Sequence, residues 1–343
     1  MKTRQQDILK TTIADFIYTA EPVGSKTLQS KYKINCSPAT IRNELKTLVD
    51  EGYLEHVHTS SGRVPTDKGY RYFVDKLSEK QTMPAQEELW FKEQFQHMGS
   101  NIQDMLIQLT ELMSSVMDYT TIVMLPSIFQ ESLKAAHLVL VDIDTVLITL
   151  MSTLGMNHQA VVNISGDVNQ EDLTKIANLL THKLGGQSFS ALDNIDVDYL
   201  IKELPSYKGV FEELVLSIGK MNESLKSQKS IYTKGKGNML RLPEFENISY
   251  AREVMECLEE TKVLHQLMQR HIDTGTVEAF IGGENGVESL SQCSVLMAPY
   301  TVEGKTVGSI SVLGPKRMDY ARLMALIHRL SGMIEDQMKP QEV

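Results

Sequence analysis

Apolar residues recur at helical spacing in three short segments at the start of the chain. The first stripe contains Ile8, Ile13, Phe16 and Ile17. Ser25 is expected to cap a shorter second helix that carries Leu28. In the third segment Ile41, Leu45 and Leu48 stand at i, i+4 and i+7, which predicts one buried face. Ser37 can cap the start of this helix and Gly52 can end it.

A short β-hairpin is expected directly after the third helix. Residues 53–58 alternate in a way that turns Leu54 and Val57 inward, and Ser60 to Gly62 supply turn chemistry. Arg63 is then expected at the tip, and Thr66 is expected to cap a fourth helix. Three helices followed by a hairpin are typical of the winged helix-turn-helix.

The outward face of the third helix is small, polar and cationic, which suits a DNA major groove. There Asn can read adenine, Arg can read guanine and a methyl group can contact thymine. Lys46 is better placed for a phosphate, and a solvated surface helix is the plain alternative for Arg42 and Asn43. The expected DNA-binding residues are Ser37, Ala39, Thr40, Arg42, Asn43, Lys46, His58, Thr59, Ser61, Gly62 and Arg63.

The remainder of the chain changes from helix to strand and back. Residues 87–117 have apolar positions at helical spacing, and β-rich segments follow within 121–164. Helices are expected over 171–184 and 250–272. Strands return only between 276 and 313, and a last helix covers 320–337. This order predicts an α+β multidomain chain in which one sheet is interrupted by an insertion.

Composition and charge narrow the class of protein. Of 343 residues, 42% are hydrophobic, and the most apolar run, 138–150, is interrupted by two aspartates. No export signal or membrane span is therefore expected, and three widely spaced cysteines fit a reducing cytoplasm. Residues 1–75 hold 11 Lys+Arg and 9 Asp+Glu, a balance of +2, whereas the whole chain carries −10 and the rest therefore −12. A mildly basic head on an acidic body permits DNA binding through one face, with two copies needed for useful affinity.

Several strings resemble one known family. SPATIRNELKTLVDEGYLEHVHTSSGRVPTDKGYRYFVD is similar to the N-terminal domain of HrcA, the heat-inducible transcription repressor family of bacteria. IGGEN at 281–285 and GSISVLGPKRMDYARLMALIHRL at 308–330 resemble that family's C-terminal half. The resemblance implies a homodimer that binds a double-stranded DNA inverted repeat upstream of chaperone operons, with support from the GroEL chaperonin.

The resemblance also sharpens the expected domains. It implies a GAF-like α/β domain, with helices around an antiparallel sheet, and a dimerising domain inserted into it. The winged-helix domain is expected at residues 1–80 and a helical connector at 81–120. The first part of the GAF-like domain is expected at 121–186, the inserted dimerising domain at 187–245 and the second part of the GAF-like domain at 246–343.

Other chemistry has weaker support in the sequence. GxSxG and HExxH are absent, so no catalytic residues, enzyme activity or cofactor are expected. His56 and His58 share one side of a strand without a third ligand, so no metal site is expected, and Cys36 fits a small filler better than a redox switch. A small-molecule effector pocket in the GAF-like domain stays as the alternative mode of regulation. The 18 methionines fit either core packing or an adaptable surface for chaperonin.

Overall fold

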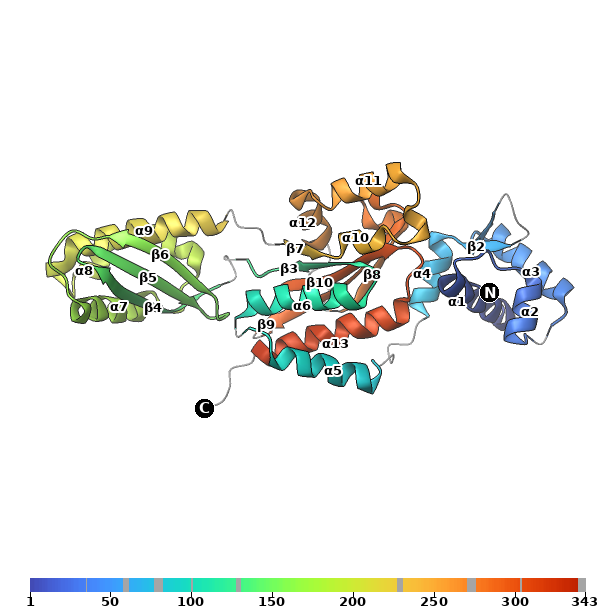
Figure 1. Cartoon of the computed structure of the whole chain (residues 1–343), viewed down its shortest axis with the longest axis horizontal. Coiled ribbons are helices and arrows are strands. Elements are labelled where there is room, and N and C mark those ends of the chain that lie inside the picture. Colours follow the sequence, from blue (N-terminus) through green and yellow to red (C-terminus); the bar gives the residue numbers. More distant parts are fainter. Residues whose placement is uncertain are drawn as a thin grey trace.

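The computed structural model describes residues 1–34, 36–57, 62–76, 83–99, 101–127, 131–226, 231–269, 276–302 and 304–338. Three units follow one another along the long axis of this mixed α/β chain (Figure 1). We call residues 1–76 the N-terminal unit, residues 131–226 the inserted unit, and the other described residues the central unit. Across the described ranges, no helix is both long and apolar enough to cross a lipid bilayer.

The N-terminal unit contains the helices and the hairpin that the sequence predicts. Its elements are α1 (Thr3–Thr19), α2 (Ser25–Tyr32), α3 (Pro38–Asp50), β1 (Leu54–His56), β2 (Arg63–Pro65) and α4 (Asp67–Asp75). Ile8, Leu28, Ile41 and Leu54 are fully or almost fully buried where these elements meet. Burial of these side chains removes apolar surface from water and so stabilises this small unit.

Hydrogen bonds of side chains fix how the first helices of this unit meet. The buried carboxylate of Asp15 in α1 accepts bonds from Lys31 Nζ at 2.5 Å and from the Tyr32 hydroxyl at 2.6 Å, both at the end of α2. Thr66 caps α4 by accepting from the Gly69 amide at 3.2 Å, as expected from the sequence. Ser25 is the first residue of α2 and does not cap it, because Gly24 occupies the cap position.

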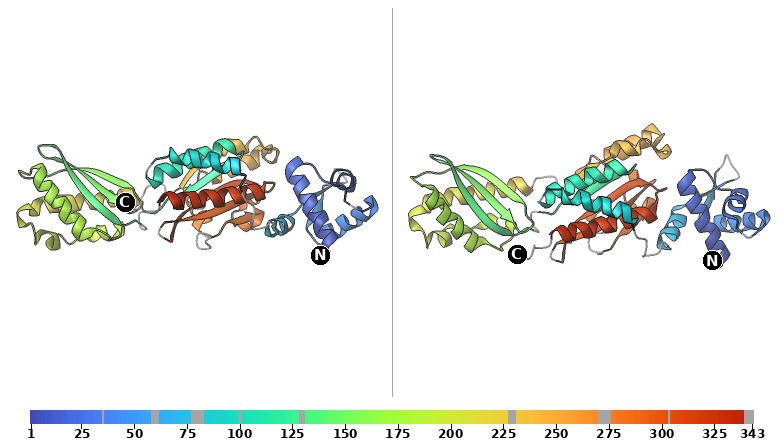
Figure 2. Two further views of the ribbon diagram at one scale, coloured as in Figure 1. Left: turned by 90° about the horizontal axis from the view of Figure 1, so that it is seen from below. Right: turned by 60° about the horizontal axis from the view of Figure 1, so that its bottom comes forward.

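The central unit is built on a five-stranded antiparallel sheet in the order β7-β3-β10-β9-β8. Its strands are β3 (Thr120–Met124), β7 (Ile231–Lys234), β8 (Glu278–Ile281), β9 (Cys293–Val302) and β10 (Lys305–Pro315). One face packs against α5 (Ala85–Gln96), α6 (Ile102–Val116) and α13 (Tyr320–Met338). The other face packs against α10 (Lys236–Met239), α11 (Ile248–Cys257) and α12 (Thr261–Gln269) (Figures 1 and 2).

Two sequence expectations about the central unit need correction. Residues 81–120 were expected to connect two domains, but α5 and α6 form part of the core, with Phe91 and Leu106 fully buried in one cluster with Ile310 of β10. Amphipathic spacing predicts a buried face but not the sheet that covers it. Residues 250–272 were expected to form one helix, and the described part of this range forms α11 and α12 with a break between them.

The inserted unit has a sheet and a core of its own. The strands β4 (Leu133–Asp142), β5 (Thr145–Ser152) and β6 (Asn157–Asn163) pair in that order, and α7 (Gln170–Leu184), α8 (Val197–Ile201) and α9 (Lys208–Lys226) cover one face. Leu138, Ile148, Leu180 and Phe211 are buried between these layers. Figure 1 places this unit at the opposite end of the molecule from the N-terminal unit.

The bounds of the insertion therefore differ from the expected 187–245. Residues 131–164 were placed with the first part of the larger sheet, yet β4 to β6 pair only with one another within the described chain. At the other end, β7 pairs with β3, so residues 231–245 return to the central unit. An alternating pattern predicts strands, but it does not say which sheet they join, because pairing between strands is a long-range property.

Candidate nucleic-acid interface

Helix α3 is held by its apolar stripe and by its N-cap. Ile41, Leu45 and Leu48 are buried against the rest of the N-terminal unit. Ser37 Oγ accepts a hydrogen bond from the Thr40 amide at 3.1 Å, and Pro38 begins the helix at a position where no amide donor is needed. The sequence predicted this cap and this stripe, and the structure confirms both.

The opposite face of α3 carries the expected base-reading residues. Ala39, Arg42, Asn43 and Lys46 are exposed, Ser37 at the helix start is exposed, and Thr40 is half-buried at the edge. Among the described residues, the side chains of Arg42, Asn43 and Lys46 make no hydrogen bond or ion pair. Their donors therefore stay available to a ligand such as DNA.

A carboxylate on the same helix is neutralised by a cation from α1. Glu44 Oε1 accepts from Arg4 Nε at 3.0 Å and from Nη2 at 2.8 Å. The hydrogen bond to Glu44 is the main reason why the pKa of Arg4 is raised. The pair removes a negative charge that would otherwise repel phosphate from this face. Sequence reasoning missed Arg4, since a contact across 40 positions leaves no local pattern.

The hairpin is anchored to the connection between α1 and α2 at the end of its strands that lies next to the hairpin turn. His56 pairs with Arg63, and Glu55 pairs with Val64. Val23 adds a bridge to the outer side of β2, where its amide donates to the Arg63 carbonyl at 2.9 Å. Gly62 is buried, and a Cβ there would lie 2.5 Å from Pro22 Cβ, so only glycine fits this approach.

Three expected site residues, His58, Thr59 and Ser61, lie outside the described residues. Arg63 is not at the tip of the hairpin, as expected from the sequence, but at the first position of β2, half-buried. Turn residues predict that the chain reverses but do not fix which residue stands at the tip. Arg63 Nη1 donates to the Gly62 carbonyl at 3.1 Å.

Arg63 and Arg42 influence each other although they belong to different elements. Burial lowers the pKa of Arg63, and the charge of Arg42 lowers it further. Arg63 stays protonated at neutral pH, because an arginine begins from a very high pKa. The two positive charges therefore repel each other, and an anion such as phosphate bound near both would relieve that repulsion.

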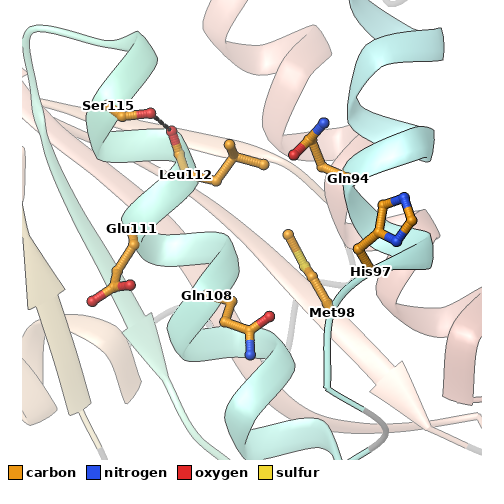
Figure 3. A pocket seen from close by; sticks show the side chains of 7 residues that line it. All are labelled: Gln94, His97, Met98, Gln108, Glu111, Leu112 and Ser115. Atoms are coloured by element: carbon orange, nitrogen blue, oxygen red, sulfur yellow. Dashed lines mark hydrogen bonds between the residues drawn. The ribbon is translucent and has the colours of Figure 1, made fainter.

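Other parts of the chain offer less for binding. Between α5 and α6 lies an open groove of about 390 Å³, on the outer helical layer of the central unit (Figure 3). Its lining side chains are Gln94, His97, Met98, Gln108, Glu111, Leu112 and Ser115. In the part of the chain that the structure describes, no three His, Cys, Asp or Glu residues are grouped as a metal site would need.

Comparisons with known proteins agree with the resemblance in the sequence. Residues 103–324 match the family model described as the HrcA protein C terminal domain. The heat-inducible transcription repressor HrcA of Desulforamulus reducens is 35% identical over 336 residues, which is 96% of this chain and 95% of the relative. The protein of the same name from Bacillus pumilus is 32% identical over 331 residues, 96% of each chain.

A solved structure supports the fold along nearly the whole chain. It is described as that of a hypothetical protein, and it superposes with a TM-score of 0.70 at 21% identity. The superposition covers 98% of both chains, so the mixed α/β arrangement is shared from end to end. Taken with the match of the family model and the near full-length identity to its members, the chain belongs to the HrcA family of heat-inducible transcription repressors.

Proposed function

We propose that this protein represses heat-shock transcription by binding an inverted-repeat operator as a dimer. In this proposal the N-terminal unit is a winged helix-turn-helix domain, the central unit is a GAF-like domain, and the inserted unit is the dimerising domain. Helix α3 enters the major groove and Arg42 and Asn43 read base edges. Lys46 and Arg63 contact phosphates, together with the wing residues His58, Thr59, Ser61 and Gly62.

The observation that carries this proposal is the outward face of α3. The side chains of Arg42, Asn43 and Lys46 are exposed and unpaired within the described chain, Arg4 neutralises Glu44 on the same helix, and Arg63 of β2 is subject to the positive charge of Arg42. The relatives' names, which call them transcription repressors, support the same conclusion.

The charge distribution argues that a single copy of the N-terminal unit would bind DNA only weakly. With a balance of +2 over residues 1–75 against −12 for the rest, a single N-terminal unit gains little from the DNA backbone. Two copies that bind two half-sites at once convert the second contact into an intramolecular one. A twofold arrangement also matches the symmetry of an inverted repeat.

The open face of the inserted sheet is a suitable dimer contact for a second copy of this chain. Val139, Leu147 and Val161 lie directly across from one another on β4, β5 and β6. Val139 and Val161 are 47% and 66% exposed, Val141 near the end of β4 is 63% exposed, and Ile143 directly after β4 is 88% exposed. An apolar row of this kind on the uncovered face of a sheet favours burial against a like surface, and a self-complementary face generates a closed dimer.

Temperature would act on the population of DNA-competent dimer. A two-state ratio changes tenfold for a shift of about 1.4 kcal/mol, so a marginally stable body suffices as the thermal switch. In this proposal a GroEL-type chaperonin raises the population of competent repressor whenever other unfolded proteins do not occupy it.

The test begins with footprinting on the promoters of the chaperone operons of the organism that carries this chain. We expect protection of both arms of an inverted repeat, with an affinity that falls as temperature rises and recovers with chaperonin. A thermal melt of the same protein should show unfolding over the same range of temperature. Equal operator affinity at all temperatures, with and without chaperonin, would contradict the thermal part of the proposal, and the absence of any protected repeat would contradict all of it.

A further inference from the structure

Helix α4 docks into a socket on the central unit that is built from two short segments far away in the sequence. We define the α4 socket as residues 279–284 and 316–320. These segments contain parts of the strings GGEN at 282–285 and PKRMDY at 315–320. Resting on the function proposed above, we propose that the α4 socket orients the reading helix and so sets the half-site spacing that a dimer accepts.

Arg71 makes the first connection. Its guanidinium forms a two-point ion pair with Glu284, in which Nε donates to Oε1 at 3.0 Å and Nη2 donates to Oε2. The same Nη2 also donates to the carbonyl of Ala279 at the edge strand β8. The hydrogen bond to Glu284 is the main cause of the raised pKa of Arg71. A fork of this geometry fixes direction as well as distance, because both nitrogens must align with both oxygens.

Asp67, at the start of α4, makes the second connection. Lys316 Nζ donates to Asp67 Oδ1 at 2.7 Å, and the Gly283 amide donates to Oδ2 at 3.4 Å. Gly282 has φ +57°, and a Cβ there would lie 2.1 Å from Asp67 Oδ2. The glycine therefore leaves the space into which the carboxylate fits.

Two further contacts hold the body of the N-terminal unit in the same orientation. The ring of Tyr70 packs on that of Tyr320 with centroids 6.1 Å apart, and both side chains are buried. Arg317 donates to the carbonyl of Ile17 near the end of α1 at 2.8 Å, and Glu244 holds Arg317 at 2.6 Å. The unit is thus fixed through two of its helices, which restrains rotation about either.

The docked position does not cover the reading face. Helices α4 and α1 lie between α3 and the central unit (Figures 1 and 2), and Arg42, Asn43 and Lys46 stay exposed. A contact that blocked DNA binding would have to hide these side chains. The socket instead holds them outward at a fixed angle to the central unit.

A fixed angle matters because the two copies of α3 in a dimer must enter successive major grooves on the same face of the DNA. Half-sites are read together only when their separation matches the distance between the two helices. A rigid attachment favours one spacing strongly, whereas a loose attachment accepts several spacings weakly, because the effective concentration of the second helix is spread over more positions. The α4 socket therefore acts as a positioning element for specificity, without contacting DNA.

The test compares two pairs of variants of the full-length protein. Gly282→Ala places a methyl group against Asp67, and Gly283→Ala is its control because a Cβ there meets nothing within 4 Å. Glu284→Gln removes the charge that Arg71 binds, and Glu288→Gln is its control because Glu288 is an exposed acid nearby. The probes are the inverted repeat found by footprinting, a duplex with one arm only, and repeats with the arms moved apart by single base pairs.

We expect Gly282→Ala and Glu284→Gln to bind the native repeat about tenfold more weakly and to lose the preference for one spacing. Their affinity for a single arm and the oligomeric state should match the wild type, as should both controls in every assay. Wild-type spacing preference in both socket variants would overturn the inference, and so would tighter binding, which would mean that docking inhibits. Weaker binding to a single arm would also overturn it, since the reading unit itself would then be damaged. Failure of the wild type to bind any repeat would instead refute the proposed function.

Discussion

Arg42 belongs to α3 and Arg63 to β2, and the positive charge of Arg42 acts on Arg63. The roles that we propose for them differ. Arg42 is exposed on the outward face of α3, whereas Arg63 is half-buried and its backbone belongs to the wing. We expect that the exposed side chain of Arg42 can be removed without disturbing the fold, so a substitution at Arg42 tests base reading more directly than one at Arg63.

We expect Arg42→Ala to weaken operator binding by about 1–3 kcal/mol and to relax specificity at one base pair. Lys46→Ala is the matched comparison, because it removes an exposed cation from the same helix face. It should weaken all sequences alike and reduce the dependence of affinity on salt. Competition binding against single-base variants of the operator separates the two effects. Unchanged specificity in Arg42→Ala would contradict its assignment as a base reader.

The three cysteines are expected to differ in reactivity. Burial raises the pKa of Cys293 to about 12 and also raises the pKa of Cys257, whereas Cys36 before α3 is half-buried. A thiol reacts as thiolate, so a raised pKa keeps Cys257 and Cys293 protonated and protected at pH 8. Alkylation of the native protein followed by mass spectrometry should modify Cys36 first. Equally fast modification of Cys293 would show that this core opens readily.

Among the elements, the hairpin of β1 and β2 is supported by residues outside its own two strands. Gly62 packs on Pro22, and β2 is bridged to Val23, so the connection between α1 and α2 supports the hairpin. A single bridge has no periodicity, which is why the sequence pattern did not reveal it.

Gly62→Ala should displace the wing, because its Cβ would lie within 2.7 Å of three Pro22 atoms. We expect weaker operator binding with α3 still folded, as measured by binding assays together with circular dichroism. Gly24→Ala is the control, since a Cβ at Gly24 meets nothing within 4 Å. Equal binding by the two variants would argue that the wing takes no part in DNA contact.

The accuracy of the sequence predictions depended on whether an element is specified locally. The Ser37 cap, the stripe of Ile41 and Leu45 and the cap at Thr66 were correct, because each depends on residues within one or two helical turns. The bounds of the insertion were wrong because β3 pairs with β7 across more than 100 positions. The contact of Arg71 with Glu284 spans 213 positions, so only the folded chain brings these residues together.

For the whole molecule, the dimerisation that we propose for the inserted unit can be tested directly. Val161→Lys places a charge on the apolar row of β6 and should shift the protein towards monomer. Leu216→Lys is the matched control, because Leu216 on α9 of the same unit is 60% exposed. Sedimentation velocity measures the mass, and operator binding should fall in step with it. A dimeric Val161→Lys would move the dimer contact elsewhere.

The central sheet separates the two surfaces that repression would use. The inserted unit leaves the chain between β3 and β7, at one edge of the sheet, and α4 docks beside β8, at the other edge. A partner bound at one end is therefore linked to DNA at the other across the width of five strands. We expect heat to act most effectively on these strands. If the central sheet lost its order while the N-terminal and inserted units stayed folded, the N-terminal units would no longer have a fixed position relative to the dimer contact. The central unit, which contacts neither DNA nor the partner copy in this proposal, would then be the part of the protein that senses temperature.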